Sequence, residues 1–375
     1  MTRKGRLSIQ KINMEGLKPP YLVLSEHQGF TDYYMAPLSF FPRRVSYVSD
    51  MEGFAAFGHW LYGAIGCIPT RRFTRDTSLI HTIYQAIEKN KDIVVVYPEA
   101  RHSSVGTNSP LYAPVGKLVK YLGIPVVILK SHGSYLDCPV WDEKHRRGAP
   151  LSVCLEKVLM PEEIKSRSAD EITAFLNEKF RYDEYRWQAE NQVRISYPKR
   201  AEGLHKVLYV CPNCLTEFEM ESKGSMLFCK MCEKQWDMDE YGRMSAKDGL
   251  TEFSHIPDWY EFQREKIICE MAQKEYTWEM EVDVEALPNA KGFVPLGKGY
   301  VSHSREGFHL FIYDTNQRLF FPSKLLPTLH NEYDYRGRGA GIVLSTKDCC
   351  YYLYPPDGKM NVTKIQFAVE YFYKG

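Results

Sequence analysis

The first half of the chain alternates between strand-like and helix-like patterns of apolar residues. Residues 7–14 alternate apolar and polar side chains, as a half-buried strand does, and residues 21–24 form an apolar run typical of a buried strand. Helix-like stretches follow at residues 33–41, 76–90, 114–122 and 162–180. Strand-like stretches lie between them at residues 44–48, 93–97 and 124–129. Strands that alternate with helices predict an α/β domain, here a mixed or parallel sheet flanked by helices over residues 1–200.

The last third of the chain changes to a period of two. Residues 257–273 have a helical pattern, and short strand-like runs separated by turns follow at residues 276–284, 307–314, 318–322, 341–345 and 349–354. Residues 362–373 carry apolar positions along one helix face. Many short strands closed by one helix predict a small, mostly-β domain over residues 255–375. Its outline resembles a pleckstrin-homology-like sandwich, which implies a module that docks on membranes or partners.

Residues 53–70 contain no formally charged side chain, and their length approaches that of a membrane-spanning helix. The stretch is also rich in glycine and reaches a proline at position 69. We therefore interpret it as a helix that is buried or lies at a membrane interface, rather than one that spans the bilayer.

Composition narrows the class of protein. A chain of 375 residues with 44% hydrophobic content can form two or three domains. Its net charge of +1 argues against a nucleic-acid-binding protein, which usually shows a basic excess. The basic N-terminus is not followed by an apolar segment, so we expect no signal peptide. These features favour a cytoplasmic protein.

Two Cys-x-x-Cys pairs form the most specific local motif. Cys211 and Cys214 make the first pair, and Cys229 and Cys232 make the second. Four thiolates at this spacing are typical of a structural zinc site. We predict a zinc ribbon over residues 206–240, with all four ligand positions filled by cysteine and none left open for catalysis.

A candidate general base follows the apolar run at residues 21–24. His27 and Asp32 lie five positions apart across a turn, where the carboxylate can fold back onto the imidazole. A carboxylate at one ring nitrogen fixes the tautomer, and histidine can accept a proton near neutral pH. The same spacing recurs at His132/Asp137 and His309/Asp314, so the pattern alone proves little.

Charged residues also follow the later apolar segments. Arg71 and Arg72 come after the uncharged stretch, and Glu99 and Arg101 come directly after the buried run at residues 93–97. Ligands of α/β sheets bind beyond the carboxyl ends of strands, and arginine pairs suit a phosphate group. For Arg71 and Arg72 the alternative is a solvated charge pair.

The order of these blocks resembles that of the glycerolipid acyltransferases, the family that includes lysophosphatidic acid acyltransferases. The four blocks are His-x-x-x-x-Asp after a strand, Gly-x-Ile-Pro-x-x-Arg, Pro-Glu, and Ile-Pro-Val at Pro125. The resemblance covers about residues 7–185 and selects His27 over His132, which follows the fourth block. It implies an acyltransferase-type mixed sheet, with the zinc ribbon and the mostly-β domain appended.

The resemblance also implies an activity in phospholipid biosynthesis. His27 would be the general base and Asp32 its orienting acid, with Arg71, Arg72, Glu99 and Arg101 around the acceptor and its phosphate. The acyl donor would be acyl-CoA or acyl-carrier protein, and the acceptor a lysolipid hydroxyl like that of 1-acylglycerol-3-phosphate. Such a protein would work peripherally at the inner face of the membrane.

The chain departs from the family pattern at two places. Glu26 stands where an Asn commonly precedes the His, and Ala100-Arg101-His102 replaces the usual Gly-Thr-Arg of the third block. The shifted arginine leaves open an acyltransferase with an amine or amino-acid lipid acceptor. A non-catalytic zinc-ribbon adaptor is a further alternative, although an adaptor has no reason to keep the His/Asp pair.

Overall fold

The computed structural model describes residues 7–74, 76–142, 144–273, 275–358 and 360–374. The chain divides into two compact units. The first comprises the described residues of Met1–Thr70, Arg75–Pro139 and Glu143–Ile195, and the second those of Arg71–Thr74, Val140–Asp142 and Ser196–Gly375.

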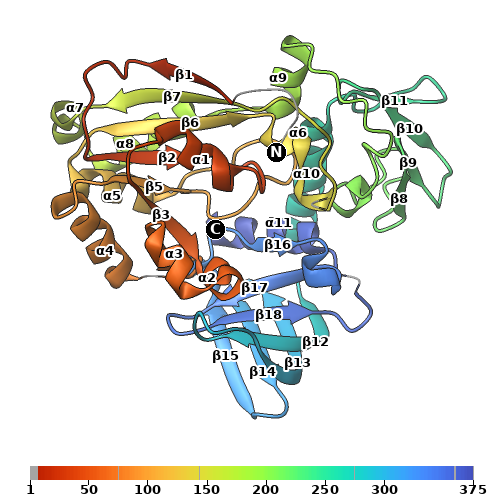
Figure 1. Ribbon diagram of the computed structural model, residues 1–375. Helices are drawn as coiled ribbons and strands as arrows, with labels where there is room; N and C mark the ends of the chain where they lie inside the picture. Colours follow the sequence, from red (N-terminus) through yellow and green to blue (C-terminus); the bar gives the residue numbers. More distant parts are fainter. Residues whose placement is uncertain (1–6, 75, 143, 274, 359, 375) are drawn as a thin grey trace. The chain divides into compact units, whose positions relative to one another are not determined.

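The first unit is built on a seven-stranded mixed sheet (Figure 1). In sheet order the strands are β1 (Ser8–Ile12), β7 (Ser152–Leu159), β6 (Val126–His132), β2 (Tyr21–Ser25), β5 (Ile93–Val96), β3 (Val45–Asp50) and β4 (Cys67–Thr70). β6 and β7 are antiparallel, and the other neighbouring strands are parallel. The predicted α/β fold with a mixed sheet is confirmed.

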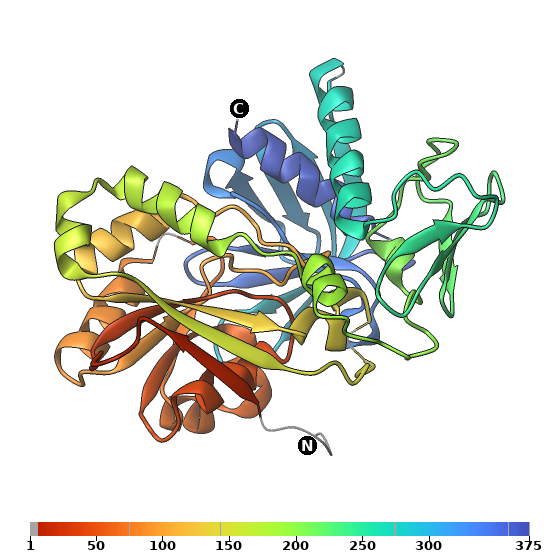
Figure 2. The same ribbon diagram turned by 90° about the horizontal axis from the view of Figure 1, so that it is seen from above.

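Helices cover both faces of this sheet. They are α1 (Asp32–Phe40), α2 (Met51–Phe57), α3 (His59–Ala64), α4 (Thr77–Glu88), α5 (Ala113–Leu122), α6 (Ser134–Asp137), α7 (Pro161–Ser166), α8 (Ala169–Phe180) and α9 (Glu184–Glu190). Leu22 and Leu24 of β2 pack in a core that includes residues of α4, α5 and α8, while Tyr21 and Val23 pack on the opposite face with α1. Figure 2 shows α1, α2 and α3 on one side of the sheet and α5 and α8 on the other.

The uncharged stretch is two short helices and a strand rather than the single helix predicted from its composition. α2 ends and α3 begins at Gly58, whose φ of 88° breaks the helical path, and β4 follows at Cys67. Among the described residues, no helix is both long and apolar enough to cross a membrane. β7 was not predicted, and the expected helix over residues 162–180 is divided between α7 and α8 at Arg167.

The second unit contains two antiparallel sheets and two long helices. The smaller sheet has the order β11 (Met244–Ala246), β10 (Gln235–Met238), β9 (Met226–Cys229) and β8 (Met220–Lys223). α10 (Ile256–Gln273) follows it. The larger sheet has the order β15 (Gln317–Pro322), β14 (Gly307–Ile312), β13 (Val294–Ser304), β12 (Trp278–Leu287), β18 (Cys350–Tyr354), β17 (Gly341–Ser345) and β16 (His330–Glu332). α11 (Val362–Lys374) closes the chain's mostly-β region, as predicted.

Candidate active site

His27 and Asp32 lie on either side of the turn that joins β2 to α1. β2 ends at Ser25, and Asp32 is the first residue of α1. The turn folds back so that His27 Nδ1 lies 3.4 Å from Asp32 Oδ2. The same carboxylate oxygen accepts the backbone N–H groups of Gln28, at 2.7 Å, and Gly29, at 3.1 Å. The Asp32 carboxylate therefore fixes both the turn and the orientation of the imidazole.

The second oxygen of Asp32 is held by two serines at the end of β6 and the start of α6. Asp32 Oδ1 accepts the hydroxyl of Ser131 at 3.0 Å and that of Ser134 at 2.6 Å. Burial alone would raise the pKa of Asp32, but hydrogen bonds from His27, Ser134 and Gly29 outweigh burial and hold the pKa below its ordinary value. An ionised Asp32 can only accept, so His27 carries its proton on Nδ1 and its lone pair on Nε2.

The sheet explains why these distant residues meet. β2 and β6 are parallel neighbours, with Ser25 opposite Leu129, so their carboxyl ends lie at the same edge. Ser131 and Ser134 are 99 and 102 positions from Asp32, and sequence reasoning missed them. The only signal was their place at the second His-x-x-x-x-Asp match, where Ser131 precedes His132 and Ser134 lies within the match, and that match drew attention to His132 instead.

Three aromatic rings surround the His27 imidazole. The His102 ring centroid lies 4.1 Å away at an interplanar angle of 71°, the Tyr97 centroid lies 4.6 Å away, and that of Tyr33 6.4 Å away. His102 belongs to the segment where the third block departs from the family pattern. The departure is visible in the sequence, but the local pattern does not place His102 against the proposed base.

Glu99 holds the backbone of the site. Its Oε1 accepts the N–H of His27 at 3.4 Å, and its Oε2 accepts the N–H of Ser109 at 2.6 Å. The Asn108 amide donates to both Glu99, at 3.3 Å, and Glu26, at 3.4 Å. Burial raises the pKa of Glu99 and raises that of Glu26 well above its ordinary value. Glu99 therefore joins the loop after β5 to the His27 turn.

The three candidate arginines have different surroundings. Arg101 is 7% exposed and donates from Nη1 to the carbonyl of His102 at 3.1 Å and the hydroxyl of Ser104 at 3.3 Å. Arg71 and Arg72 fall in the second unit. There the Arg71 guanidinium donates to two backbone carbonyls at 2.8 Å each, those of Pro288 and Lys347. Binding of the acceptor by these arginines stays a prediction.

The rival pair, His132 and Asp137, binds other groups. His132 Nδ1 lies 2.9 Å from the Tyr182 hydroxyl, and its ring stacks on Trp187 with centroids 5.2 Å apart. Burial lowers the pKa of His132 to about 4, with help from Lys130. Asp137 pairs with Arg146 and accepts the N–H groups of Gly148 and Ala149. His132 and Asp137 therefore bind groups that stabilise the fold around them, whereas His27 and Asp32 contact each other.

A buried carboxyl beside His132 makes the stability of this region depend on pH. Glu184 accepts the hydroxyl of Tyr182 and the N–H of Gly133, and burial raises its pKa from 4.5 to about 8. The folded chain therefore holds a proton that the unfolded chain has released, and stability falls as the pH rises from about 4.5 to about 8. We expect Glu184→Gln, which is neutral at every pH, to raise the melting temperature more at pH 8 than at pH 5.

The exposed Glu190 of the same helix supplies the control, because Glu190→Gln should change the melting temperature equally at both pH values. An equal shift for Glu184→Gln at both pH values would contradict the raised pKa.

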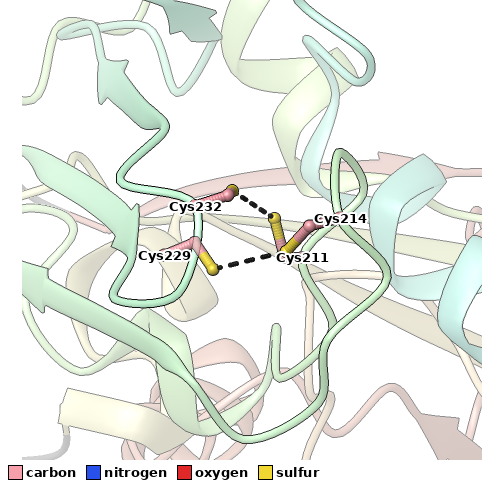
Figure 3. A group of neighbouring side chains, drawn as sticks. All are labelled: Cys211, Cys214, Cys229 and Cys232. Carbon is pink, nitrogen blue, oxygen red and sulfur yellow. Dashed lines mark hydrogen bonds between the residues drawn. The ribbon is translucent and has the colours of Figure 1, made fainter.

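The four cysteines of the predicted ribbon converge (Figure 3). Their sulfur atoms all lie within 4.8 Å of one another, with Cys211–Cys232 and Cys214–Cys229 separations of 3.7 Å. Four sulfurs bound tetrahedrally at ~2.3 Å from one zinc lie ~3.8 Å apart, so these residues fit that ion. Two of the cysteines are buried and two are half-buried.

Comparison with known proteins bears on the first unit. Residues 6–129 match the family model described as Acyltransferase, a range that contains His27, Asp32, Glu99 and Arg101. Among solved structures, the chain is similar to the crystal structure of the 1-acyl-sn-glycerophosphate (LPA) acyltransferase PlsC from Thermotoga maritima. That match has a TM-score of 0.36 and 16% identity, and it covers 46% of this chain and 69% of that chain. No curated protein matches the chain.

Proposed function

From the match of residues 6–129 to the Acyltransferase family model, we propose that the chain transfers a fatty acyl group from a thioester to a lipid acceptor. The observation that carries the proposal is the buried His27–Asp32 pair, in which the imidazole lies 3.4 Å from an ionised carboxylate. A non-catalytic adaptor would not need a carboxylate that accepts two backbone N–H groups, two serine hydroxyls and an imidazole.

The chemistry follows from the tautomer. His27 Nε2 removes the proton of the acceptor hydroxyl as its oxygen attacks the thioester carbonyl carbon, and Asp32 stabilises the imidazolium that forms. The tetrahedral intermediate then expels the thiolate, which leaves as the thiol after taking the proton from His27. The carbon–sulfur bond breaks, an ester bond forms, and the base is regenerated. The substrate supplies the nucleophile, so the chain needs only to bind and orient the two substrates and to move one proton.

We propose acyl-CoA or acyl-carrier protein as the donor and a lysophospholipid such as 1-acylglycerol-3-phosphate as the acceptor. The order of the four sequence blocks supports this acceptor. The second candidate is an amine or amino-acid lipid, because Arg101 donates to the third block's own backbone and hydroxyl groups. Cys211, Cys214, Cys229 and Cys232 would hold a structural zinc that links the two Cys-x-x-Cys pairs, called the two knuckles below.

The direct test supplies the purified chain with a labelled acyl thioester and one lysolipid at a time. We expect transfer to an acceptor with a free phosphate, identified by mass spectrometry of the product. Transfer only to an amine-bearing lipid would select the second candidate. A folded chain that transfers to neither class of acceptor would contradict the proposed reaction.

Arg72 and Arg71 allow a sharper prediction about the acceptor. If the second block binds a phosphate, Arg72→Gln should raise the KM for the phosphate-bearing acceptor roughly tenfold to a hundredfold, the equivalent of about 1.5–3 kcal/mol. The KM for the acyl donor should change little. Arg71→Gln should chiefly lower the melting temperature, because the Arg71 guanidinium donates to two backbone carbonyls. Equal changes in both KM values for Arg72→Gln would argue against a phosphate contact.

A further inference from the structure

Exposed apolar side chains concentrate on the helices near the proposed catalytic pair. Phe41 at the end of α1 and Trp60 on α3 are each 82% exposed, and Phe57 at the end of α2 is 58% exposed. Together with these three, the exposed side chains are Phe30, Tyr33, Leu38, Leu61 and Ile65. We call these eight residues the α1–α3 apolar surface. Single exposed apolar residues are normal, but a group of them on one side of a domain suggests an interaction site.

The structure of α2 and α3 keeps these side chains outside. The break at Gly58 lets Tyr62 of α3 pack on Phe54 of α2, with centroids 5.0 Å apart, and stack on Phe57 at 5.6 Å. Gly53 makes room for Tyr62, because a Cβ at that position would collide with its ring. Phe54 and Tyr62 are buried as the inner side of this helix pair. Trp60 and its neighbours therefore point outward from a packed structure.

One end of the α1–α3 apolar surface, at Tyr33 and Phe30, lies beside the proposed active site. Figures 1 and 2 place α1, α2 and α3 on the same side of the sheet. Tyr33 lies 6.4 Å from the His27 ring and 5.3 Å from Phe30, measured between centroids. An aromatic path thus runs from the imidazole to the exposed side chains of Tyr33 and Phe30. A water-insoluble acyl chain held on this surface would have a short route to His27.

Composition favours a lipid bilayer over a protein partner. Residues 53–66 offer polar side chains only at His59, Trp60 and Tyr62, whereas a specific protein interface needs about one hydrogen bond per 100–200 Å². The exposed Arg43 and Arg44 follow Phe41 after one proline, Pro42. Aromatic side chains bordered by arginines are typical of segments that lie in the headgroup region of a membrane.

We propose that the α1–α3 apolar surface docks on a lipid bilayer, with Phe41, Phe57 and Trp60 entering the headgroup region. The proposal rests on the proposed function in one respect, since it takes the substrate to be a membrane lipid. It names the part of the chain that contacts the membrane and places the proposed base beside that contact. Insertion of these side chains would give lipid access to His27 from the bilayer side.

The test measures binding of the full chain to vesicles of phosphatidylcholine mixed with phosphatidylglycerol, by co-sedimentation without substrates. We expect Phe41→Ser combined with Trp60→Ser to weaken binding at least about tenfold, because two large aromatic side chains leave the interface. The matched control is Leu215→Ser combined with Leu250→Ser, which removes two apolar side chains that are 54% and 73% exposed elsewhere. This control should bind as the wild type does, and melting temperatures should confirm that both variants fold.

The His27→Ala protein separates docking from catalysis. It should bind vesicles like the wild type, so that failure of the proposed reaction leaves the docking result intact. Wild-type affinity in the Phe41/Trp60 variant would overturn the proposal. A wild-type chain that ignores vesicles but self-associates through these residues, as light scattering would show, would assign the surface to a second copy and overturn it equally.

Discussion

Replacing His27 with alanine should reduce acyl transfer by about 10²- to 10⁴-fold, the usual contribution of a positioned general base. The imidazole is oriented by Asp32 at 3.4 Å, and Nε2 carries the lone pair that accepts the acceptor's proton. Without it, the hydroxyl must attack while still protonated. The loss should appear in kcat, with little change in the KM for the acyl donor, because the proton moves only as the transition state forms.

The fold should survive this change, which distinguishes a catalytic from a structural histidine. The His27 side chain donates to Asp32, but two backbone N–H groups and two serine hydroxyls still bind that carboxylate. His132→Ala is the comparison, since it removes the histidine of the second His-x-x-x-x-Asp match. This variant should keep most of the activity but melt at a lower temperature, because His132 stacks on Trp187 and forms a hydrogen bond with Tyr182. Normal turnover by a folded His27→Ala protein would disprove the assignment.

The pairing of His27 with Asp32 could be predicted because its geometry is local. His27 and Asp32 are joined by one turn, so their spacing allowed the pair, and the order of the four blocks selected it over His132 and Asp137. Ser131 and Ser134 reach Asp32 only because β6 lies beside β2, and strand order cannot be read from apolar runs. The third block showed that His102 was unusual, but only the fold placed its ring 4.1 Å from that of His27.

The fold follows the same division between local and distant effects. The apolar runs of β2, β5 and β6 predicted buried strands, and their place in the middle of the sheet explains the match. β7 was missed because Glu156 and Lys157 interrupt its pattern, and its identity as a strand depends on pairing with both β1 and β6. The uncharged stretch was predicted as one helix because composition does not reveal the positive φ of Gly58.

The ribbon is bonded to the long helices of the second unit. Val210, next to the first cysteine, donates its N–H to Gln263 of α10 at 2.8 Å and accepts from the Trp259 indole at 2.9 Å. Glu217, between the two knuckles, pairs with Lys266 of α10 and Lys364 of α11. Burial of these contacts makes the ribbon, α10 and α11 depend on one another.

Removing the metal ligands should therefore affect more than the ribbon. We expect elemental analysis to find about one zinc per chain in the wild type and none in the variant that combines Cys211→Ser with Cys229→Ser. Structural zinc in small finger peptides contributes about 10–16 kcal/mol at pH 7, comparable to the whole stability of a domain. Loss of that energy should free the first knuckle and, through Val210 and Glu217, loosen α10 and α11. Amide hydrogen exchange should accelerate in the ribbon and in both helices.

Cys269→Ser is the matched control, because Cys269 is exposed on α10 and lies outside the four-sulfur cluster. That variant should keep its zinc and exchange amide hydrogens as the wild type does. Chelation at low pH should reproduce the effect of the double variant, since protonated thiols release zinc. If the zinc-free double variant kept slow exchange in α10 and α11, the bonds from Val210 and Glu217 would be too weak to couple the ribbon to the helices. The zinc would then stabilise the ribbon alone.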